Sequence, residues 1–433
     1  MSHGRLAACL LGLLALPAWA ADYPRAPTAA ELGIMQGRPV PEARRVTLAN
    51  WMSPPFNRWS LQHLSQVLPT AAVYRGNGPV PEMPVRQRDL AGLRFEAAPG
   101  RTLSISEWLA ASYTDGFIVI KDGAIVFEAY LNGMQPQTHH LSYSISKSVL
   151  GILAGILVDA GALDVTRSVE SYVPELKGSG FAGHSVRDLL DMQVPIDWRE
   201  DYADANGSWR RWKNAIGWTV EDPPAGRPPA GNYAFLSSLQ EDPDWPGGFK
   251  YVSPSAEVLG WVLERAGSQP LAELLSEKLW VPLGAQHDAY FATDRSFAPA
   301  AAGGFGATLR DLARLGQMVL ADGRMNDRQV VSRKWLADIR FNGNNEAWRT
   351  GQYKGYWNPA GAYRSLWYVS GDADGSFEAI GIHGQRLHVN PAQNLVVVRL
   401  SSCPDPVSRD DYDLGSRAIA AIRVHLLTEA SAR

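Results

Sequence analysis

The stretch "SYSISKSVLGIL", Ser142 to Leu153, places serine hydroxyls and one lysine at the head of a run that is otherwise almost entirely apolar. The run predicts a long helix that begins near Ser144 and stops at Gly161. In a helix, residues three apart lie on one face about a turn from each other, so Ser144 and Lys147 become neighbours.

This pairing has a chemical use. Backbone N–H groups at the start of a helix are unpaired and carry a positive potential, which suits a developing oxyanion near Ser144. Burial among Val149, Leu150 and Ile152 should lower the pKa of Lys147 toward neutrality, and a neutral amine can take the serine's proton. The alternative is that Ser144 only caps the helix while Lys147 extends to water.

Two downstream segments supply the further groups that such a pair needs. In "FKYVSPSAEVLGWVLERAG", Tyr251 and Ser253 come immediately before a predicted helix, and the tyrosine can pass a proton to a leaving group. In "EAIGIHGQRLHV", Gly381 interrupts an apolar strand, expected at a sheet edge, where a ligand can approach the backbone N–H of Ile382 as a second oxyanion donor. The alternatives are a core tyrosine, an N-capping serine and a bulge glycine.

The rest of the chain indicates an α/β (α+β) fold, in which an antiparallel sheet is flanked by helices and holds a mostly helical second subdomain. An Asp-Gly turn in "GFIVIKDGAIVFEAYLNG" predicts a hairpin over 116–133, and 378–402 predicts two more strands about a turn at Asn390-Pro391. Helical periodicity ending at glycine or closing the chain marks 255–267, 269–284, 308–323 and 413–427. We therefore expect one sheet completed by distant segments.

In this order, Ser144-x-x-Lys147, Tyr251-x-Ser253 and the late glycine strand resemble the serine β-lactamase and penicillin-binding superfamily, in which Ser-x-x-Lys is a catalytic motif. "NWMSPPFNRWSLQHL" (50–64) and "AIGIHGQ" (379–385) resemble its class C-type, 6-aminohexanoate-dimer hydrolase branch. The resemblance implies a β-lactamase/transpeptidase-like fold, Ser144 as nucleophile, Lys147 as base, Tyr251 as proton relay and an oxyanion hole from Ser144 and Ile382.

The chain departs from the family pattern in ways that bear on substrate. Where β-lactamases usually carry Lys-Thr-Gly, this chain has Ala379-Ile380-Gly381. The Tyr251-x-Ser253 motif ends in serine where the family usually has asparagine. We therefore expect an amidase or esterase, with a D,D-peptidase, a β-lactamase or a catalytically silent sensor as alternatives. By position, Tyr202 and Asp201 resemble residues of the family's substrate loop, the alternative being a solvated loop.

His383 lies between two glycines and is expected to border the pocket without being catalytic. Together with Ser253 and Gly381, it completes the predicted substrate-binding set. His139 and His140 are excluded as metal ligands because neighbours in a strand point to opposite faces and no third ligand has the right spacing. No cofactor is expected, and the predicted partner is a small amide or ester.

Length, charge and the N-terminal residues limit the domain organisation, partners and location. The chain has 433 residues and a formal net charge of −3, without the basic excess that favours nucleic acid. Residues 1–20 read as a signal peptide, 21–100 as an extended arm, and 101–433 as the hydrolase domain with a helical insertion at about 165–300. Signal removal leaves Cys403 as a single cysteine and no membrane span, so a periplasmic or secreted location is expected. The oligomeric state stays open.

Overall fold

The main sheet joins strands from both halves of the chain, as expected from the sequence. The computed structural model describes residues 23–204, 206–220, 230–355 and 357–431, so the predicted signal peptide lies outside the described residues. Every neighbouring pair in the sheet is antiparallel. Its strands, in spatial order, are β11 (Ala362–Arg364), β12 (Trp367–Val369), β13 (Phe377–Gly381), β14 (Gln385–Asn390), β15 (Leu395–Ser401), β4 (Thr114–Lys121) and β5 (Ala124–Tyr130).

The β4–β5 hairpin is the one predicted from the Asp-Gly pair. Asp122 and Gly123 both have positive φ values, 50° and 75°, which a tight two-residue hairpin turn requires. β4 then pairs with β15, which lies more than 270 residues later in the chain, from Lys121 opposite Leu395 to Thr114 opposite Ser401. Both strands carry runs of consecutive apolar residues, which point alternately to the two faces, so the sheet needs cover on both faces.

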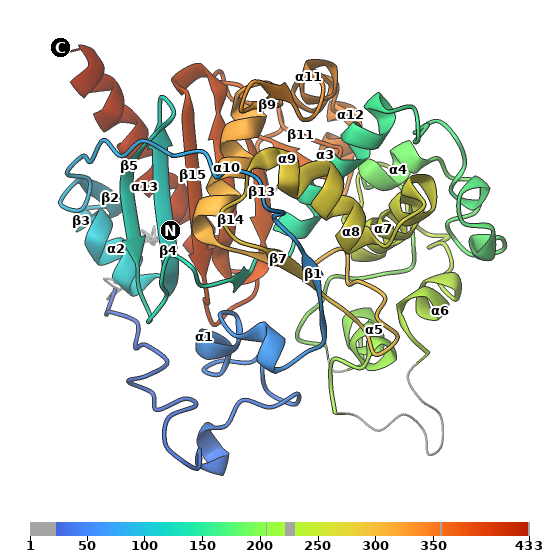
Figure 1. Cartoon of the computed structure of the whole chain (residues 1–433), viewed down its shortest axis with the longest axis horizontal. Helices are drawn as coiled ribbons and strands as arrows, with labels where there is room; N and C mark the ends of the chain where they lie inside the picture. The colour runs from blue at the N-terminus through green and yellow to red at the C-terminus, as the bar shows by residue number, and fades with distance from the viewer. Residues whose placement is uncertain (1–22, 205, 221–229, 356, 432–433) are drawn as a thin grey trace, which may run out of the picture.

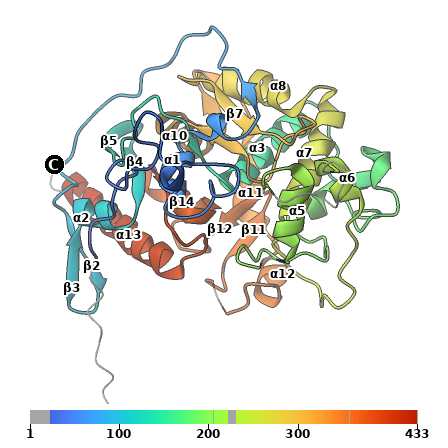
Figure 2. The ribbon, with the colours of Figure 1, turned by 90° about the horizontal axis from the view of Figure 1, so that it is seen from below.

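Helices cover both faces of this sheet. Phe117 and Val119 of β4 point to one face, where they pack with α2 (Ile105–Ala111) and α13 (Arg409–Ser431). Ile118 and Ile120 point to the other face and join the larger core, which includes α3 (Ile145–Asp159) and α10 (Leu309–Leu320). In Figure 1 this layered part lies on the left, and Figure 2 shows α13, α2 and the β2–β3 hairpin together at one end of the molecule.

The helical subdomain lies on the right in Figure 1. Its helices follow α3 in the chain, in the region predicted as an insertion: α4 (Val186–Leu190), α5 (Ser208–Ile216), α6 (Asn232–Ser237), α7 (Ser253–Gly267), α8 (Leu271–Leu275), a π turn (Ser276–Trp280) and α9 (Val281–Leu283). Two further helices precede β11, namely α11 (Arg333–Phe341) and α12 (Asn345–Thr350). The remaining turns of 3₁₀ helix are η1 (Glu42–Arg44), η2 (Leu64–Gln66), η3 (Val169–Ser171), η4 (Pro174–Leu176), η6 (Ile382–Gly384) and η7 (Pro391–Gln393).

The segment 23–100, predicted as an extended arm, contains short helices and strands of three to five residues. It carries α1 (Asn57–Ser60) and β1 (Thr70–Val73), which pairs with β7 in a second sheet. That sheet has the order β1, β7 (Ala289–Ala292), β8 (Phe305–Ala307), β6 (His140–Leu141). The predicted boundary at residue 100 falls within a hairpin, between β2 (Arg94–Ala98) and β3 (Arg101–Ser104), and a smaller hairpin joins β9 (Arg324–Met325) to β10 (Arg328–Gln329).

A buried ion pair fastens this N-terminal segment to the main sheet. Arg58 of α1 donates to the Asp115 carboxylate at 2.9 Å and to the Ser402 hydroxyl at 2.7 Å, although Arg58 is only 4% exposed. The other Asp115 oxygen lies 3.0 Å from Nε2 of His140. Because a buried charge is tolerated only when it is paired and hydrogen-bonded, this cluster explains how Arg58 can be buried within the 50–64 segment.

One expectation for the late strands was wrong. Residues 378–402 form parts of three strands and not two, because the chain turns at η6, where His383 and Gly384 have φ values of 62° and 89°. β12 pairs with β13 on the side away from β14, but only at Phe377 and Glu378, so Ile380 and Gly381 lie beyond β12, at an edge of the sheet as expected. The mixed α/β architecture with antiparallel sheets is nevertheless the predicted fold class.

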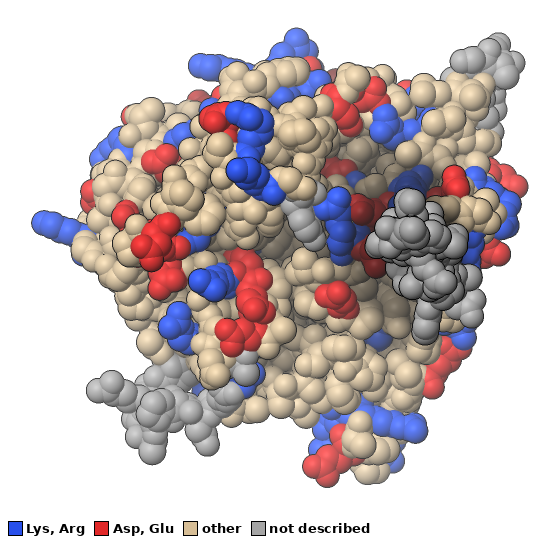
Figure 3. Space-filling view, turned by 180° about the vertical axis from the view of Figure 1, so that it is seen from behind, with Lys and Arg blue, Asp and Glu red and all other residues tan. Residues whose placement is uncertain are grey.

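Helix length and surface charge were also compared with what a membrane span or a strongly charged face requires. In the part of the chain that the structure describes, no helix is long and apolar enough to cross a bilayer. Acidic and basic side chains are interspersed on the face seen from behind in Figure 3, and the surface is hollowed near its middle.

Candidate active site

Ser144 lies at the N-cap of α3, and its hydroxyl makes no capping hydrogen bond. Instead, Nζ of Lys147 donates to Oγ of Ser144 at 2.9 Å, one helical turn away. The hydroxyl is therefore available for chemistry, and the alternative in which Ser144 only caps the helix does not match the geometry.

Lys147 does not extend to water. Its side chain is 1% exposed, and its second partner is the carbonyl oxygen of Ala302 at 3.0 Å. Burial lowers the lysine pKa to about 8, while the negative charges of Glu200 and Glu257 oppose that shift. The amine can thus lose its proton close to neutral pH, which a general base requires.

Tyr251 contacts both Lys147 and Ser144. Its ring centroid lies 5.0 Å from Nζ of Lys147, and its hydroxyl interacts with the side chains of Ser144 and Tyr368. Burial and the charge of Glu200 raise the tyrosine pKa, so Tyr251 stays protonated at neutral pH and can donate. The structure thus brings Ser144, Lys147 and Tyr251 together from α3 and the start of α7.

The two residues predicted to form the oxyanion hole, Ser144 and Ile382, line the same two cavities. A Cβ built on Gly381 would lie 3.0 Å from the backbone nitrogen of Ser144 and 2.6 Å from the carbonyl oxygen of Ser142. Only glycine therefore allows the end of β13 to approach the start of α3 this closely. The glycine was expected to make room for a ligand, but the space is used by the chain's own backbone.

A pair of rings flanks both donors. Tyr143 precedes Ser144, His383 follows Ile382, and both have left-handed backbones with φ values of 45° and 62°. Their ring centroids lie 5.3 Å apart, and Nδ1 of His383 lies 2.7 Å from the carbonyl oxygen of Cys403. Burial lowers the His383 pKa to about 4, so the ring is neutral at working pH. Strained residues beside two N–H donors are typical of a preorganised site.

The predicted substrate residues are distributed unevenly around this centre. Tyr202, Ser253 and Gly381 line cavities that open at Ser144, whereas His383 is buried behind them and lines neither cavity. Asp201 is also not brought to the nucleophile. It is exposed, and Oδ1 accepts from the backbone of Ala203 and Asp204, so its carboxylate stabilises its own loop.

Sequence reasoning missed two carboxylates. Glu200 accepts from the indole of Trp198 at 2.8 Å, from the backbone N–H of Ser253 at 2.6 Å and from the hydroxyl of Tyr202 at 3.0 Å. It therefore joins the loop at 198–202 to the start of α7. The sequence carried no recognisable signal for this role, because the contact with Ser253 depends on how two segments 53 residues apart meet.

The second missed carboxylate is Glu257, on α7. It accepts from the backbone N–H groups of Ala301 and Ala302 at 2.8 and 3.0 Å, and thereby fixes the carbonyl that contacts Lys147. Burial raises its pKa to about 7. Among the described residues, no three His, Cys, Asp or Glu side chains are grouped so that they could hold a metal ion.

Both a family model and a curated relative match most of this chain. Residues 110–422 match the family described as Beta-lactamase. A 6-aminohexanoate-dimer hydrolase of Paenarthrobacter ureafaciens is 37% identical over 370 residues, which are 86% of this chain and 91% of that protein.

Solved structures agree with this match. The one called "Putative 6-aminohexanoate-dimer hydrolase from Bacillus anthracis" has a TM-score of 0.80 and 26% identity, covering 90% of this chain and 99% of that one. A class C β-lactamase from Rhodobacter sphaeroides, 17% identical with a TM-score of 0.50, covers 74% of this chain and 97% of its own and shares the fold. The resemblance seen in the sequence is thus confirmed, and the chain belongs to the β-lactamase family, as a serine hydrolase similar to 6-aminohexanoate-dimer hydrolases.

Proposed function

We propose that this protein hydrolyses a small amide or ester through an acyl-enzyme on Ser144, with Lys147 as the general base. The observation that carries the proposal is the 2.9 Å contact between Nζ of Lys147 and Oγ of Ser144, made by a buried amine whose pKa is lowered to about 8. A serine hydroxyl is a weak nucleophile until an adjacent base accepts its proton.

Each proton has a place in this reaction. Ser144 Oγ bonds to the carbonyl carbon while its proton passes to Lys147, and the oxyanion is held by the N–H groups of Ser144 and Ile382. Each such donor contributes roughly 3 to 4 kcal/mol to transition-state stabilisation. The C–N or C–O bond then breaks, and the leaving atom takes a proton from Tyr251, which regains one from the Lys147 ammonium. Water repeats these steps to release the acid.

The relatives' names and the late strand favour an amidase or esterase over a β-lactamase. The matched relative is named for the 6-aminohexanoate dimer, in which an amino group and a carboxyl group are joined as an amide. In β13, Ala379 is fully buried and Ile380 lines the cavity, so no cation stands at this family position to meet an antibiotic carboxylate. The N-terminal 1–20 segment supports export, and we place the enzyme in the periplasm or outside the cell.

The test is labelling and turnover. A fluorophosphonate probe should label the wild-type protein, and a chromogenic short-chain ester should be cleaved, while Ser144→Ala should lose both signals. Turnover that survives in Ser144→Ala would contradict the assignment of the nucleophile. Absence of both signals in the wild type would favour a silent sensor, and rapid cleavage of the chromogenic cephalosporin nitrocefin would favour a β-lactamase. Protease-accessibility of the protein in intact cells, compared with a chain lacking 1–20, tests export.

A further inference from the structure

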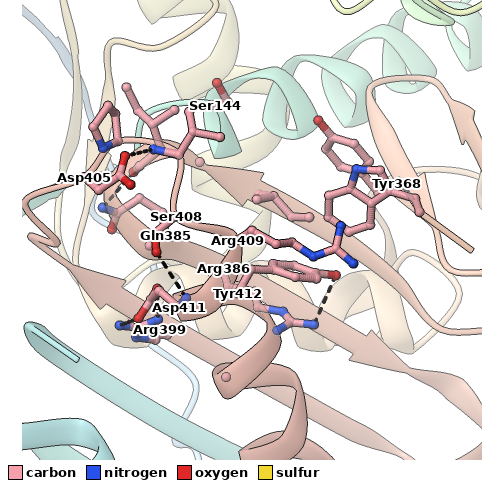
Figure 4. Close-up of a pocket in the computed structure, with 18 of the residues that line it drawn as sticks. Ser144, Tyr368, Gln385, Arg386, Arg399, Asp405, Ser408, Arg409, Asp411 and Tyr412 are labelled. Carbon is pink, nitrogen blue, oxygen red and sulfur yellow. Dashed lines mark hydrogen bonds and ion pairs between the residues drawn. The ribbon is translucent and has the colours of Figure 1, made fainter. Parts of the chain in front are cut away.

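A large cavity runs from the nucleophile to the C-terminal helix, and nothing in the proposed reaction yet uses it. Its volume is about 270 Å³, and it extends from Ser144 past the ends of β13 and β14 to the first turns of α13. Figure 4 shows Ser144 at one end and Arg399 and Asp411 at the other. We refer to it as the α13 cavity.

The proton donor decides which half of a substrate enters this cavity. A second, smaller cavity of about 20 Å³ shares Ser144 and Ile382 with the α13 cavity. Tyr251 lines the α13 cavity and not the small one, whereas Lys147 lines only the small one. Since Tyr251 protonates the leaving atom in the proposed reaction, the leaving half of the substrate points into the α13 cavity.

One wall of the α13 cavity is a row of stacked rings that begins at the proton donor. The ring centroids of Tyr251 and Tyr368 lie 6.2 Å apart, and those of Tyr368 and Trp357 lie 5.8 Å apart. At the end of the row, Cζ of Arg409 lies 5.8 Å from the centroid of Trp357. An extended chain advances roughly 1.2 Å per bond, so about five to ten bonds cover the row from Tyr251 to Trp357.

The carboxylates in the cavity wall lie at the end near the nucleophile. The Glu200 charge acts on the pKa values of both Lys147 and Tyr251, and Figure 4 shows Asp405 beside Ser144. An anionic group of a substrate is therefore disfavoured at this end of the cavity. If the leaving half carries a carboxylate, that group has to lie at the other end of its chain.

These polar side chains also have partners within the protein. Glu200 accepts the three hydrogen bonds described above. Asp405 accepts from the N–H of Val407 at 2.9 Å, and the side-chain oxygen of Gln352 accepts from the N–H of Tyr251 at 2.8 Å. The hydroxyl of Ser408 accepts from the N–H of Asp411 at 3.2 Å and so caps α13. These contacts give the wall its shape.

Two of the three arginines that line the cavity are held by buried carboxylates. Arg386 lies 2.6 Å from Glu378, and Arg399 lies 2.7 Å from Asp411. Their side chains are only 10% and 5% exposed, and they also donate to hydroxyl or carbonyl groups of the chain. Opening either pair would leave an uncompensated buried charge, which is strongly unfavourable.

The third arginine, Arg409, lies in the first turn of α13 and reaches solvent. Its Nε lies 2.9 Å from the carboxylate of Asp413, one turn along the helix, and both side chains are 41% exposed. In Figure 4 the Arg409 side chain points toward Tyr368. An exposed ion pair contributes little, because water screens it. A second carboxylate can therefore share or replace Asp413 without leaving a buried charge uncompensated.

We propose that Arg409 selects the leaving half of the substrate by binding a carboxylate at the far end of an alcohol or amine that occupies the α13 cavity. The inference rests on the proposed function, because Tyr251 as proton donor sets the direction of the chain. When the C–O or C–N bond breaks, the leaving atom takes the Tyr251 proton and the acyl group stays on Ser144. The planar guanidinium of Arg409 suits a carboxylate, which it can meet with two parallel N–H donors.

Two acetate esters that differ in one group test this selection. 6-Acetoxyhexanoate ends in a carboxylate, and 6-acetoxyhexanamide replaces it by an uncharged carboxamide of nearly the same shape. In the wild type, kcat/KM should be about five- to tenfold higher for the acid than for the amide, the order expected for a hydrogen bond to a charged group that stays partly hydrated. Equal values for the two esters would overturn the proposal.

Variants of α13 connect this preference to Arg409. Arg409→Gln should bring the acid-to-amide ratio of kcat/KM close to one, and Arg409→Lys, which keeps the charge without the planar donors, should retain part of the preference. Asp413→Asn removes the competing carboxylate and should raise the ratio about twofold. Arg417→Gln and Asp410→Asn change exposed residues of α13 outside the cavity wall and should leave the ratio unchanged. A ratio that persists in Arg409→Gln, or that falls equally in Arg417→Gln, would refute a specific role of Arg409.

A binding measurement keeps this test separate from the catalytic proposal. Calorimetry with 6-hydroxyhexanoate, the alcohol product, should show binding to Ser144→Ala and at least about fivefold weaker binding to the Ser144→Ala/Arg409→Gln double variant. Equal affinities, or no binding to Ser144→Ala, would refute the subsite even when both esters are hydrolysed. If binding depends on Arg409 but neither ester is turned over, the subsite stands and the serine hydrolase proposal fails.

Discussion

Two buried cations in this molecule have opposite surroundings. Arg58 is 4% exposed and contacts the Asp115 carboxylate, which in turn contacts His140. Lys147 is 1% exposed, yet its two hydrogen-bond partners are a hydroxyl and a backbone carbonyl, both neutral. Arg58, which is paired with a carboxylate, holds the N-terminal segment on the sheet. Lys147, which contacts no carboxylate directly, has a pKa lowered to about 8 and is suited to move a proton.

The largest effect that this comparison predicts is on activity at Lys147. Lys147→Met should lower kcat for a short-chain ester by a factor of about 10² to 10⁴, because a positioned general base contributes that order of rate enhancement. The free energy of unfolding should not fall, since methionine has a similar shape and needs no hydration. Steady-state kinetics and urea denaturation measure the two quantities.

A loss of kcat without a loss of stability would show that Lys147 acts in catalysis and not in folding. Lys147→Arg serves as a second variant, because arginine keeps a charge but cannot become a neutral base. A strongly destabilised Lys147→Met protein, or an active Lys147→Arg protein, would mean that Lys147 is a structural cation like Arg58.

The second prediction concerns stability at the paired cation. Arg58→Met leaves the buried Asp115 carboxylate without its cation and should lower the free energy of unfolding by about 3 to 5 kcal/mol. The exposed pair of Arg265 and Glu175, at 2.5 Å, provides the control, and Arg265→Met should cost less than about 1 kcal/mol. Equal losses in the two variants, measured by urea denaturation, would remove the distinction between buried and exposed pairs on which the comparison rests.

Structural features that depend on residues close in the chain could be predicted from the sequence. The β4–β5 hairpin follows from Asp122 and Gly123, and the Ser144–Lys147 pair follows from the period of one helix, since both depend on residues close in the chain. Arg58 could not be assigned to Asp115, because 57 residues separate them and many partners are compatible with the same composition. Only the resemblance to a known family indicated that the three motifs, at Ser144, at Tyr251 and at Gly381, come together in space.

The oxyanion region shows where sequence reasoning ends. Gly381 stood out as a glycine inside a strand, but its neighbours Ser142 and Ser144 are contacts through space that no local period predicts. Glu200 and Glu257 were missed for the same reason. Asp201 accepts hydrogen bonds from its own loop, and His383 contacts the carbonyl oxygen of Cys403, neither of which the sequence indicated. The pairing of β12 with the start of β13 was also not predicted, because β11 and β12 are short strands with weak patterns of their own.

The third prediction is the pH dependence of the wild-type enzyme. Activity needs the neutral form of Lys147, and below a pKa of about 8 the neutral fraction falls tenfold for each pH unit. kcat/KM should therefore rise about tenfold per unit up to pH 8 and level off above it. The raised pKa of Tyr251 keeps its proton in place, so no loss is expected between pH 8 and 10. A profile that falls above pH 8 would show that the reactive form carries a proton on the lysine.

The smallest predicted effect tests whether nearby charge tunes the lysine. The Glu200 carboxylate raises the Lys147 pKa against the larger effect of burial, so Glu200→Gln should move the acid limb of the pH profile to lower pH. Glutamine can keep the contacts, because its oxygen can accept from Trp198 and Ser253 while its amide donates to the Tyr202 hydroxyl.

The control for this variant is Glu241→Gln, a half-exposed carboxylate paired with His184, which should leave the profile unchanged. A limb that moves to higher pH in Glu200→Gln would contradict the electrostatic account, since removing a negative charge cannot stabilise an ammonium. A limb that stays in place would mean that the Glu200 charge does not tune the Lys147 pKa, and that Glu200 acts only through its hydrogen bonds to Trp198, Tyr202 and Ser253. The expected move to lower pH would show that the charges around each cation, and not burial alone, separate Lys147 from Arg58.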